Sequence, residues 1–294
     1  MAALVLQVSA VLNATNLGLM LAIVAIGLTL VFGFMEVLNA AHGAFWMIGA
    51  YLTWWTSTTL GNFWLSIVVV TVAMIALGAA VEIGLLRRVY DLSPLVQLML
   101  TFGLLNIITG MVYIFVGSRG KTVNVPEALR SSVTILGEAY PLYRLFVTAV
   151  AAALILATWA LLKFTDVGIA VRASLLDREM ARGLGHNIPR IYTFVFIGSV
   201  VLAGWAGMLM VPIRGITPTS GLTILLEAFA LVIIGGLGSF RGTVVAAFMV
   251  GFAEVFAVRY ISFQLSGLII YVVLLAVILV RPYGIFGVKQ AAEQ

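Results

Sequence analysis

Long stretches without a charged residue alternate with short polar connections along this chain. Asp, Glu, Lys and Arg are absent from residues 1–35, 37–81, 92–118, 145–162, 191–213 and 260–280. A charged side chain at the centre of a bilayer costs a few kcal/mol, so stretches of this kind indicate membrane spans. About 20 apolar residues cross a bilayer as a helix. The pattern therefore predicts an all-α fold, a polytopic bundle of transmembrane helices.

The stretch 37–81 is too long for one helix, and the polar residues from Thr56 to Asn62 break it. Segments 222–238 and 243–259 are short and rich in Gly, which leaves broken or re-entrant helices open as an alternative. We expect about eight to ten spans in a single transmembrane domain over residues 1–294. The predicted spans lie near 16–34, 39–59, 63–86, 95–117, 144–163, 191–212, 222–238, 243–259 and 264–281.

The composition excludes an ordinary soluble domain. Hydrophobic residues make up 63% of the 294 residues and charged residues 9%, against roughly a quarter in soluble domains. The chain has no Cys and two His, so thiolate catalysis and Cys-based metal sites are excluded and no metal site is expected. The net charge is +5, but the basic residues are scattered between apolar segments, which favours membrane orientation over nucleic-acid binding.

The basic residues of the connections predict the orientation. Arg87 and Arg88 lie in one connection, five basic residues lie in or beside the connection 164–190, and Arg281 follows the last span. The positive-inside rule places all three in the cytoplasm. With nine spans, the N-terminus and the connection 118–143 are then outside and the C-terminus is inside.

The cytoplasmic connection 164–190 carries an amphipathic pattern. A short helix is predicted over roughly 170–184, with Leu176, Met180 and Leu184 recurring every four residues on one face and arginines on another. This pattern suits insertion into a groove on a partner protein. The alternative is a helix that lies on the inner surface of the membrane.

Four sequence blocks together carry a family resemblance. They are VFGFMEVLNAAHGAFWMIGAYLTWW (31–55), VRASLLDREMARGLGHNIPR (171–190), IGGLGSFRGTVVAAFMVGFAE (234–254) and VRPYGIFG (280–287). In this order, over nearly the whole chain, they resemble the LivH-type permeases. These are membrane subunits of bacterial ABC importers for branched-chain amino acids, and their relatives import urea, short amides and similar small solutes.

The resemblance implies a multi-pass permease subunit in the bacterial inner membrane. It would form the path for a branched-chain amino acid or a similar small polar solute, together with a second, LivM-like permease subunit. Two cytoplasmic ATPase subunits would use ATP, and an extracytoplasmic binding protein would deliver the solute. This chain would bind no cofactor and no nucleic acid, would contact membrane lipid, and would have no enzymatic activity of its own.

The resemblance also places residues. Asn39–Gly43 matches the NxAHG block, Gly49–Tyr51 the following GAY, and Gly235–Ser239 the GGxGS turn. The path or packing candidates are Asn39, His42, Gly43, Gly49, Tyr51, Asn106, Glu227, Gly235, Gly236 and Gly238. The residues expected in the ATPase-coupling loop are Ala173, Asp177, Glu179, Met180, Ala181, Leu184, Gly185 and Asn187.

These blocks also have a physical interpretation without the family. Glycines allow two helices to approach closely, or leave helix ends whose N–H groups hold a solute carboxylate, and both interpretations stay open. His42 beside Asn39 and Glu36 favours a structural hydrogen-bonding network over a proton relay.

Polar residues inside the spans are costly in lipid and are expected to face the bundle interior or a cavity. They are Glu82, Glu227, Glu254 and Asn106. Glu82 lies within two turns of Arg87 and Arg88, so snorkelling towards the cytoplasm is its alternative explanation. Glu227 is the preferred residue lining the path.

Two other classes of function are alternatives for an apolar chain of this kind. A secondary transporter or channel driven by an ion gradient would use Glu82, Glu227 or Glu254 to carry protons. A membrane enzyme would need a nucleophile–base pair or a metal cluster, and the sequence contains no GxSxG or HExxH motif.

Overall fold

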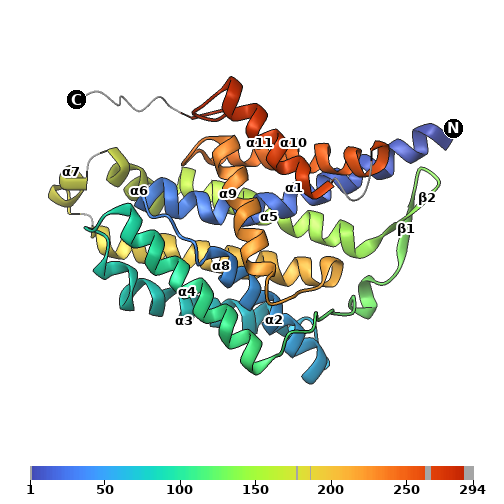
Figure 1. Ribbon diagram of the computed structural model, residues 1–294, viewed down its shortest axis with the longest axis horizontal. Coiled ribbons are helices and arrows are strands. Elements are labelled where there is room, and N and C mark those ends of the chain that lie inside the picture. The colour runs from blue at the N-terminus through green and yellow to red at the C-terminus, as the bar shows by residue number, and fades with distance from the viewer. Residues whose placement is uncertain (1, 177, 186, 262–265, 288–294) are drawn as a thin grey trace. The chain divides into compact units, whose positions relative to one another are not determined.

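The computed structural model describes residues 2–176, 178–185, 187–261 and 266–287. Within them the chain is almost entirely helical (Figure 1), which confirms the predicted all-α polytopic fold. The long helices are α1 (Ala2–Met35), α2 (His42–Thr59), α3 (Leu65–Gly84), α4 (Pro94–Phe115), α5 (Leu142–Phe164), α8 (Ile188–Arg214) and α10 (Phe240–Tyr260). The shorter helices are η1 (Leu86–Arg88), η2 (Glu127–Leu129), α6 (Asp166–Leu176), α7 (Arg178–Gly183), α9 (Ser220–Gly235) and α11 (Ser266–Val280).

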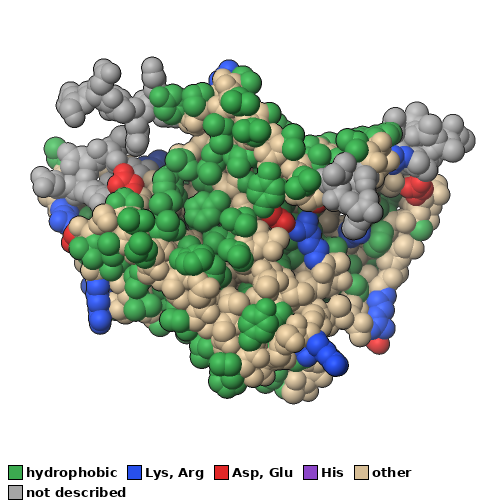
Figure 2. Space-filling view, viewed as in Figure 1, with side chains coloured by type: hydrophobic (Ala, Val, Ile, Leu, Met, Phe, Trp, Pro, Cys, Tyr) green, Lys and Arg blue, Asp and Glu red, His purple; other side chains and the backbone are tan. Residues whose placement is uncertain are grey.

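In the described part of the chain, 6 helices are long and apolar enough to cross a membrane. They are α1, α3 with η1, α4, α5, α8 and α10, and the shorter apolar helices α9 and α11 add to them. Helix α2 is more polar, yet it contributes many buried side chains. Hydrophobic side chains make up a large part of the face shown in Figure 2, and charged ones are few. The surface is therefore suited to lipid.

Local signals fix several helix starts. Pro94 occupies the first turn of α4, where its missing N–H costs nothing. Asn187 caps α8 by accepting the Arg190 N–H at 3.2 Å, and Ser239 caps α10 by accepting the Gly242 N–H at 3.1 Å. Both caps satisfy backbone donors that have no partner within the first turn of the helix.

Helices α1 and α2 are separated by a non-helical segment, residues 36–41, most of which is buried. Glu36 adopts a positive φ of 58° and ends the helical geometry. The Thr101 side chain of α4 satisfies the segment's backbone: its hydroxyl accepts the Ala40 N–H at 3.0 Å and lies 3.0 Å from the Leu38 carbonyl oxygen. Buried irregular backbone needs such partners. The second span therefore begins at His42, three residues later than predicted.

The contacts divide the chain into two compact units. Unit 1 contains residues 1–29, 124–152 and 226–294, and unit 2 contains residues 30–123 and 153–225. In unit 2, α8 packs against α2 and α3, and α2 also contacts α4. In unit 1, α10 packs against α11, and its Gly251 contacts Gly18 of α1. The single transmembrane domain stays a prediction.

The connection 118–143 contains a hairpin that the sequence pattern did not predict. Strand β1 (Ser132–Ile135) pairs antiparallel with β2 (Glu138–Pro141). The two-residue turn between them has positive φ at both Leu136 (52°) and Gly137 (94°), the geometry that joins antiparallel strands most tightly.

In the connection 164–190 the described residues form α6 and α7, on either side of Asp177. Helical structure begins at Asp166, earlier than the predicted start near residue 170. Asp177 and His186, on either side of α7, lie outside the described residues.

Candidate functional site

Glycines bring α2 into direct backbone contact with its neighbours in unit 2. A Cβ on Gly49 would overlap the Gly204 carbonyl of α8, and a Cβ on Gly43 would overlap the Gly221 carbonyl of α9. Small residues that let helix backbones approach are typical of membrane helix pairs. The predicted glycines of α2 therefore serve close packing in this structure.

The glycines of the 234–254 block have a corresponding role in unit 1. A Cβ on Gly235 would overlap the backbone of Gly242, and both Gly236 (φ 101°) and Gly238 (φ 77°) adopt a conformation that favours glycine. The turn receives the end of the chain: the Ile285 N–H donates to the Ile234 carbonyl at 2.9 Å, and the Phe286 N–H to the Gly235 carbonyl at 3.0 Å. Two of the four sequence blocks are therefore one structural element.

Two path candidates carry buried donors. Asn39 is fully buried; its Oδ1 accepts the Ala41 N–H at 3.1 Å, while its Nδ2 has no hydrogen-bond partner among the described residues. The Tyr51 hydroxyl of α2 is also buried without a partner in that part of the chain. Buried polar groups in this state need an explanation, and a polar ligand is one.

His42 opens α2 and is fully buried. Its Nδ1 lies 3.4 Å from the Ser199 hydroxyl of α8. The contact joins two helices that already touch through glycine. It supports the structural network that the sequence favoured for this histidine.

Glu82 lies at the centre of a polar cluster in unit 2. Its carboxylate is fully buried; Arg87 donates to Oε2 at 2.9 Å, the Tyr90 hydroxyl to Oε1 at 2.9 Å, and the Thr193 hydroxyl to Oε2 at 2.8 Å. Burial, with the nearby Glu82 charge, raises the pKa of Tyr90. The cluster joins the end of α3 to the start of α8, a link between helices that the sequence analysis did not predict.

The other intramembrane polar residues differ from one another. Asn106 does not face the interior of the bundle: it is exposed on α4, where its amide donates to the Phe102 carbonyl of the same helix at 2.8 Å. That intrahelical bond offsets part of the cost of an exposed amide in lipid. Glu227 of α9 and Glu254 of α10, both in unit 1, are half-buried.

The predicted coupling residues whose side chains are described differ in exposure. Met180 is 61% exposed and Leu184 70% exposed, whereas Ala181 between them is buried. Gly185 has a φ of 90° and ends the segment, and Asn187 caps α8. Ala173 lies half-buried in α6, Glu179 lies in α7, and Asp177 is outside the described residues.

The opposite end of α8 also joins two connections. The Lys121 N–H donates to the Ile216 carbonyl at 2.8 Å, and the Ile216 N–H donates back at 2.9 Å. The segment after α4 and the segment after α8 therefore meet at one end of unit 2, whereas the Glu82 cluster lies at the other end of α8.

Among the described residues, no group of three or more His, Cys, Asp or Glu side chains is arranged to hold a metal ion. The chemistry that these residues offer is hydrogen bonding and close helix packing. With several apolar helices that are long enough to span a membrane, they define a polytopic membrane protein.

The chain belongs to the family described as branched-chain amino acid transport system / permease component, whose sequence profile matches residues 10–278. The permease protein LivH of Salmonella typhimurium, from a high-affinity branched-chain amino acid transport system, is 29% identical over 94% of each chain. BraD of Pseudomonas aeruginosa, from a system of the same description, is 26% identical over 94% of each chain. Among solved structures, PsaBC from Streptococcus pneumoniae in complex with Fab covers 91% of this chain and 89% of its own, at 14% identity and a TM-score of 0.48.

The resemblance to LivH-type permeases and the prediction of a permease subunit are thereby confirmed. The secondary transporter driven by an ion gradient is not supported.

Proposed function

We propose that this chain forms part of the membrane path of an ABC importer for a branched-chain amino acid or a similar small polar solute. The observation that carries the proposal is the family match over residues 10–278, together with relatives named for branched-chain amino acid transport. Two cytoplasmic ATPase subunits hydrolyse ATP, and an extracytoplasmic binding protein delivers the solute. The chain itself binds no cofactor and catalyses no reaction.

The solute contacts are assigned to the donors that the fold leaves available. The Asn39 amide and the Tyr51 hydroxyl are buried without a partner among the described residues, and both can donate to a carboxylate. Asn39 lies in the non-helical segment before α2, the kind of interrupted helix that lines solute sites in transporters. In unit 1, Glu227 stays the preferred acidic candidate.

The coupling mechanism follows from the order of contacts in unit 2. Met180 and Leu184 are exposed for an ATPase groove, and Ala181 packs inward and holds α7 to the chain. The segment leads directly into the Asn187 cap of α8, and α8 touches α2 through Gly49. A movement of α7 is thereby transmitted to the helix that carries Tyr51.

The orientation has the N-terminus outside, the C-terminus in the cytoplasm, the connection 118–143 outside and the connection 164–190 inside. Two contacts support it. Arg87, from one connection rich in basic residues, meets Thr193 of α8, which follows the other such connection, at one end of unit 2. Lys121 and Ile216, from two connections assigned to the outside, meet at the other end.

A second, LivM-like permease subunit completes the path. Helix α4 has a largely exposed apolar surface, with Met99, Phe102 and Ile107 outward. Asn106 lies on the same helix, and its exposed amide is costly against lipid alone. Contact with another permease subunit would bury the exposed apolar side chains of α4 and would remove the Asn106 amide from lipid.

The test is transport in liposomes that contain the full chain, its second permease subunit and the ATPase subunits, with the binding protein outside. Leucine uptake that requires ATP and the binding protein is expected. Uptake by the chain alone under an ion gradient, with no ATP, would contradict the proposal.

A further inference from the structure

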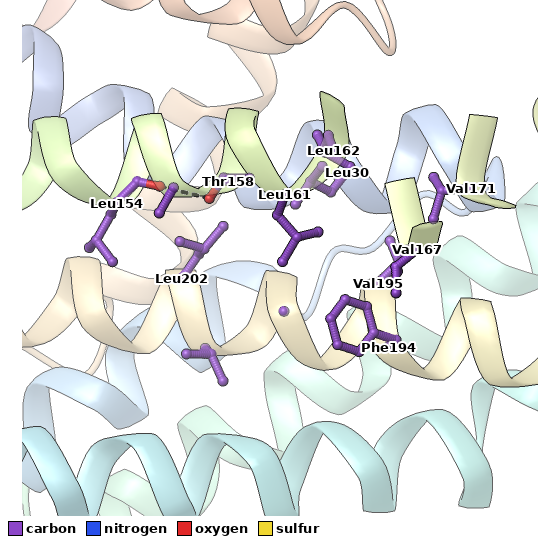
Figure 3. Close-up of a pocket in the computed structure, with 13 residues that line it drawn as sticks. Leu30, Leu154, Thr158, Leu161, Leu162, Val167, Val171, Phe194, Val195 and Leu202 are labelled. Atoms are coloured by element: carbon purple, nitrogen blue, oxygen red, sulfur yellow. Dashed lines mark hydrogen bonds between the residues drawn. The ribbon is translucent and has the colours of Figure 1, made fainter. Parts of the chain in front are cut away.

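Unit 2 contains an apolar groove of about 230 Å³ between α5, α6 and α8 (Figure 3). Leu154, Leu161 and Leu162 line it from one face of α5, while Phe194, Val195 and Leu202 line it from α8. The spacing of these residues is that of a single helix face on each side. Both walls are therefore continuous apolar stripes.

The side chains that line the groove provide no free hydrogen-bond donor for a polar solute. Thr158 is the one polar side chain among the described residues that line it, and its hydroxyl already donates to the Leu154 carbonyl at 2.8 Å. A solute with a carboxylate would lose its hydration there without gaining a hydrogen bond. The groove is therefore distinct from the solute path assigned to Asn39 and Tyr51.

The lining of the groove matches a hydrocarbon chain. Such a chain needs no hydrogen bond, so it can lie between the two apolar stripes without leaving a polar group unpaired.

Basic side chains lie at one end of the groove. Lys163 follows Leu162 at the end of α5, Arg172 follows the lining residue Val171, and Arg190 lies one helical turn before Phe194. Arg172 donates to the Leu162 carbonyl, and the Lys163 Nζ lies 4.7 Å from the centre of the Trp159 ring.

All three basic residues are exposed, and Asp166 is the acidic residue of the adjoining first turn of α6. The three basic residues outnumber the one acidic residue, so this end of the apolar groove carries a net positive charge.

The end of the groove is held in place by close packing. A Cβ on Gly168 of α6 would overlap the Leu162 carbonyl, so α6 lies directly against the end of α5. Only 17% of the residues in the most apolar part of α5 are buried. The remaining residues of that part are available to lipid.

We propose that the groove binds one acyl chain of an anionic phospholipid, whose phosphate lies against Lys163, Arg172 and Arg190. Basic pockets between membrane helices are a recognised arrangement for anionic headgroups. The inference requires only that unit 2 is embedded in a bilayer, and it does not depend on the solute or on the partner subunits.

Gly198 provides a direct test because it lines the groove and a Cβ there meets no described atom within 4 Å. Gly198→Leu should fill the groove without displacing the backbone. Gly103 of α4 is equally open and lies outside the groove, so Gly103→Leu is the matched control.

The full chain is purified and mixed with dioleoyl phosphatidylglycerol or dioleoyl phosphatidylcholine, and bound lipid is counted by native mass spectrometry. The wild type should prefer phosphatidylglycerol. Gly198→Leu should weaken that binding about tenfold, since it displaces roughly two buried methylenes. Gly103→Leu should bind as the wild type does.

Equal binding by the wild type and Gly198→Leu, or equal binding of the two lipids, would overturn the proposal. So would a Gly198→Leu variant that keeps its lipid but loses the second permease subunit. The double variant Lys163→Gln/Arg190→Gln should remove the preference for phosphatidylglycerol and leave phosphatidylcholine binding unchanged.

A second measurement needs no variant. Phosphatidylglycerol with a diazirine in its acyl chain, photolysed with the wild-type protein, should label peptides that contain residues 154–171 and 194–202. Labelling confined to other helices would reject the site.

Discussion

The Arg87 guanidinium lies 2.9 Å from the carboxylate of Glu82, whose side chain is fully buried. Two hydroxyl groups complete the coordination of the carboxylate, one from Tyr90 and one from Thr193. Hydrogen bonds and the arginine charge compensate for the burial of this carboxylate. Loss of the cation alone would leave an uncompensated buried charge, which strongly destabilises the fold. The pair therefore fixes the end of α3 against the start of α8.

Replacing Arg87 tests this role. Arg87→Ala leaves the Glu82 charge buried without its cation, and we expect the free energy of unfolding in detergent to fall by about 3 kcal/mol. Arg88 is exposed in the same turn, so Arg88→Ala is the control and should change stability by less than about 0.5 kcal/mol. Equal losses in the two variants would contradict the assigned role.

Tyr90 predicts a dependence of stability on alkaline pH. Its pKa is raised above the ordinary value of 10.0 by burial and by the Glu82 carboxylate. The unfolded chain therefore loses this proton first, so the contribution of Tyr90 is complete below pH 10 and is lost as the pH rises further. Between pH 9 and pH 11, the unfolding temperature of Tyr90→Phe should fall less steeply with pH than that of the wild type. Parallel curves would show that Tyr90 is not responsible.

The contact between Gly49 and Gly204 predicts that a single methyl group is not tolerated. Gly49→Ala would place a Cβ against the Gly204 carbonyl and force α2 and α8 apart, at a cost of about 2–3 kcal/mol. Gly103→Ala meets no described atom and should gain roughly 0.5–1 kcal/mol from helix propensity. Denaturant unfolding of both variants measures the difference, and a neutral Gly49→Ala would disprove the close approach.

Removal of the Tyr51 hydroxyl should affect transport and leave stability unchanged. No described residue accepts its hydrogen bond, so Tyr51→Phe should leave the unfolding temperature almost unchanged. If the hydroxyl donates to the solute, the KM for ATP-driven uptake should rise roughly tenfold. Tyr271→Phe on α11, at a 40% exposed position, is the control. Unchanged uptake kinetics in Tyr51→Phe would remove this residue from the path.

The exposed residues of the coupling segment predict a defect in assembly. Met180→Glu/Leu184→Glu places two charges where an apolar groove of the ATPase is proposed to bind, and binding should weaken at least about tenfold. Co-purification and ATP-driven uptake report the loss. Leu136→Glu in the hairpin of the connection 118–143 changes a side chain that is 66% exposed and should have no effect. Retained co-purification in the double variant would place the coupling surface elsewhere.

Much of the fold followed from the charge-free stretches, because a buried charge in lipid is costly enough to mark the ends of spans. The pairing of Gly49 with Gly204 did not follow, since a sequence identifies small residues but not the neighbours they approach. The association of Gly235 with Phe286 was missed for the same reason. Asn106 was misplaced because its own helix supplies the hydrogen-bond acceptor.

Two irregular features had weak signals. The hairpin turn uses Leu136 with a positive φ where Asn or Asp would be expected, so the usual turn pattern is absent. The non-helical segment before α2 depends on Thr101 from another helix, which no local pattern reveals.

The backbone bonds from Ile285 and Phe286 to the turn after α9 have a consequence for biosynthesis. Unit 2 closes with residue 225, so its contacts can form while the ribosome is still translating the remainder. Unit 1 draws on segments before and after unit 2, and its α9–α10 turn receives the hydrogen bonds of Ile285 and Phe286 only when those residues have been translated. A premature stop codon after Val280 would therefore leave every described helix translated and that turn incomplete.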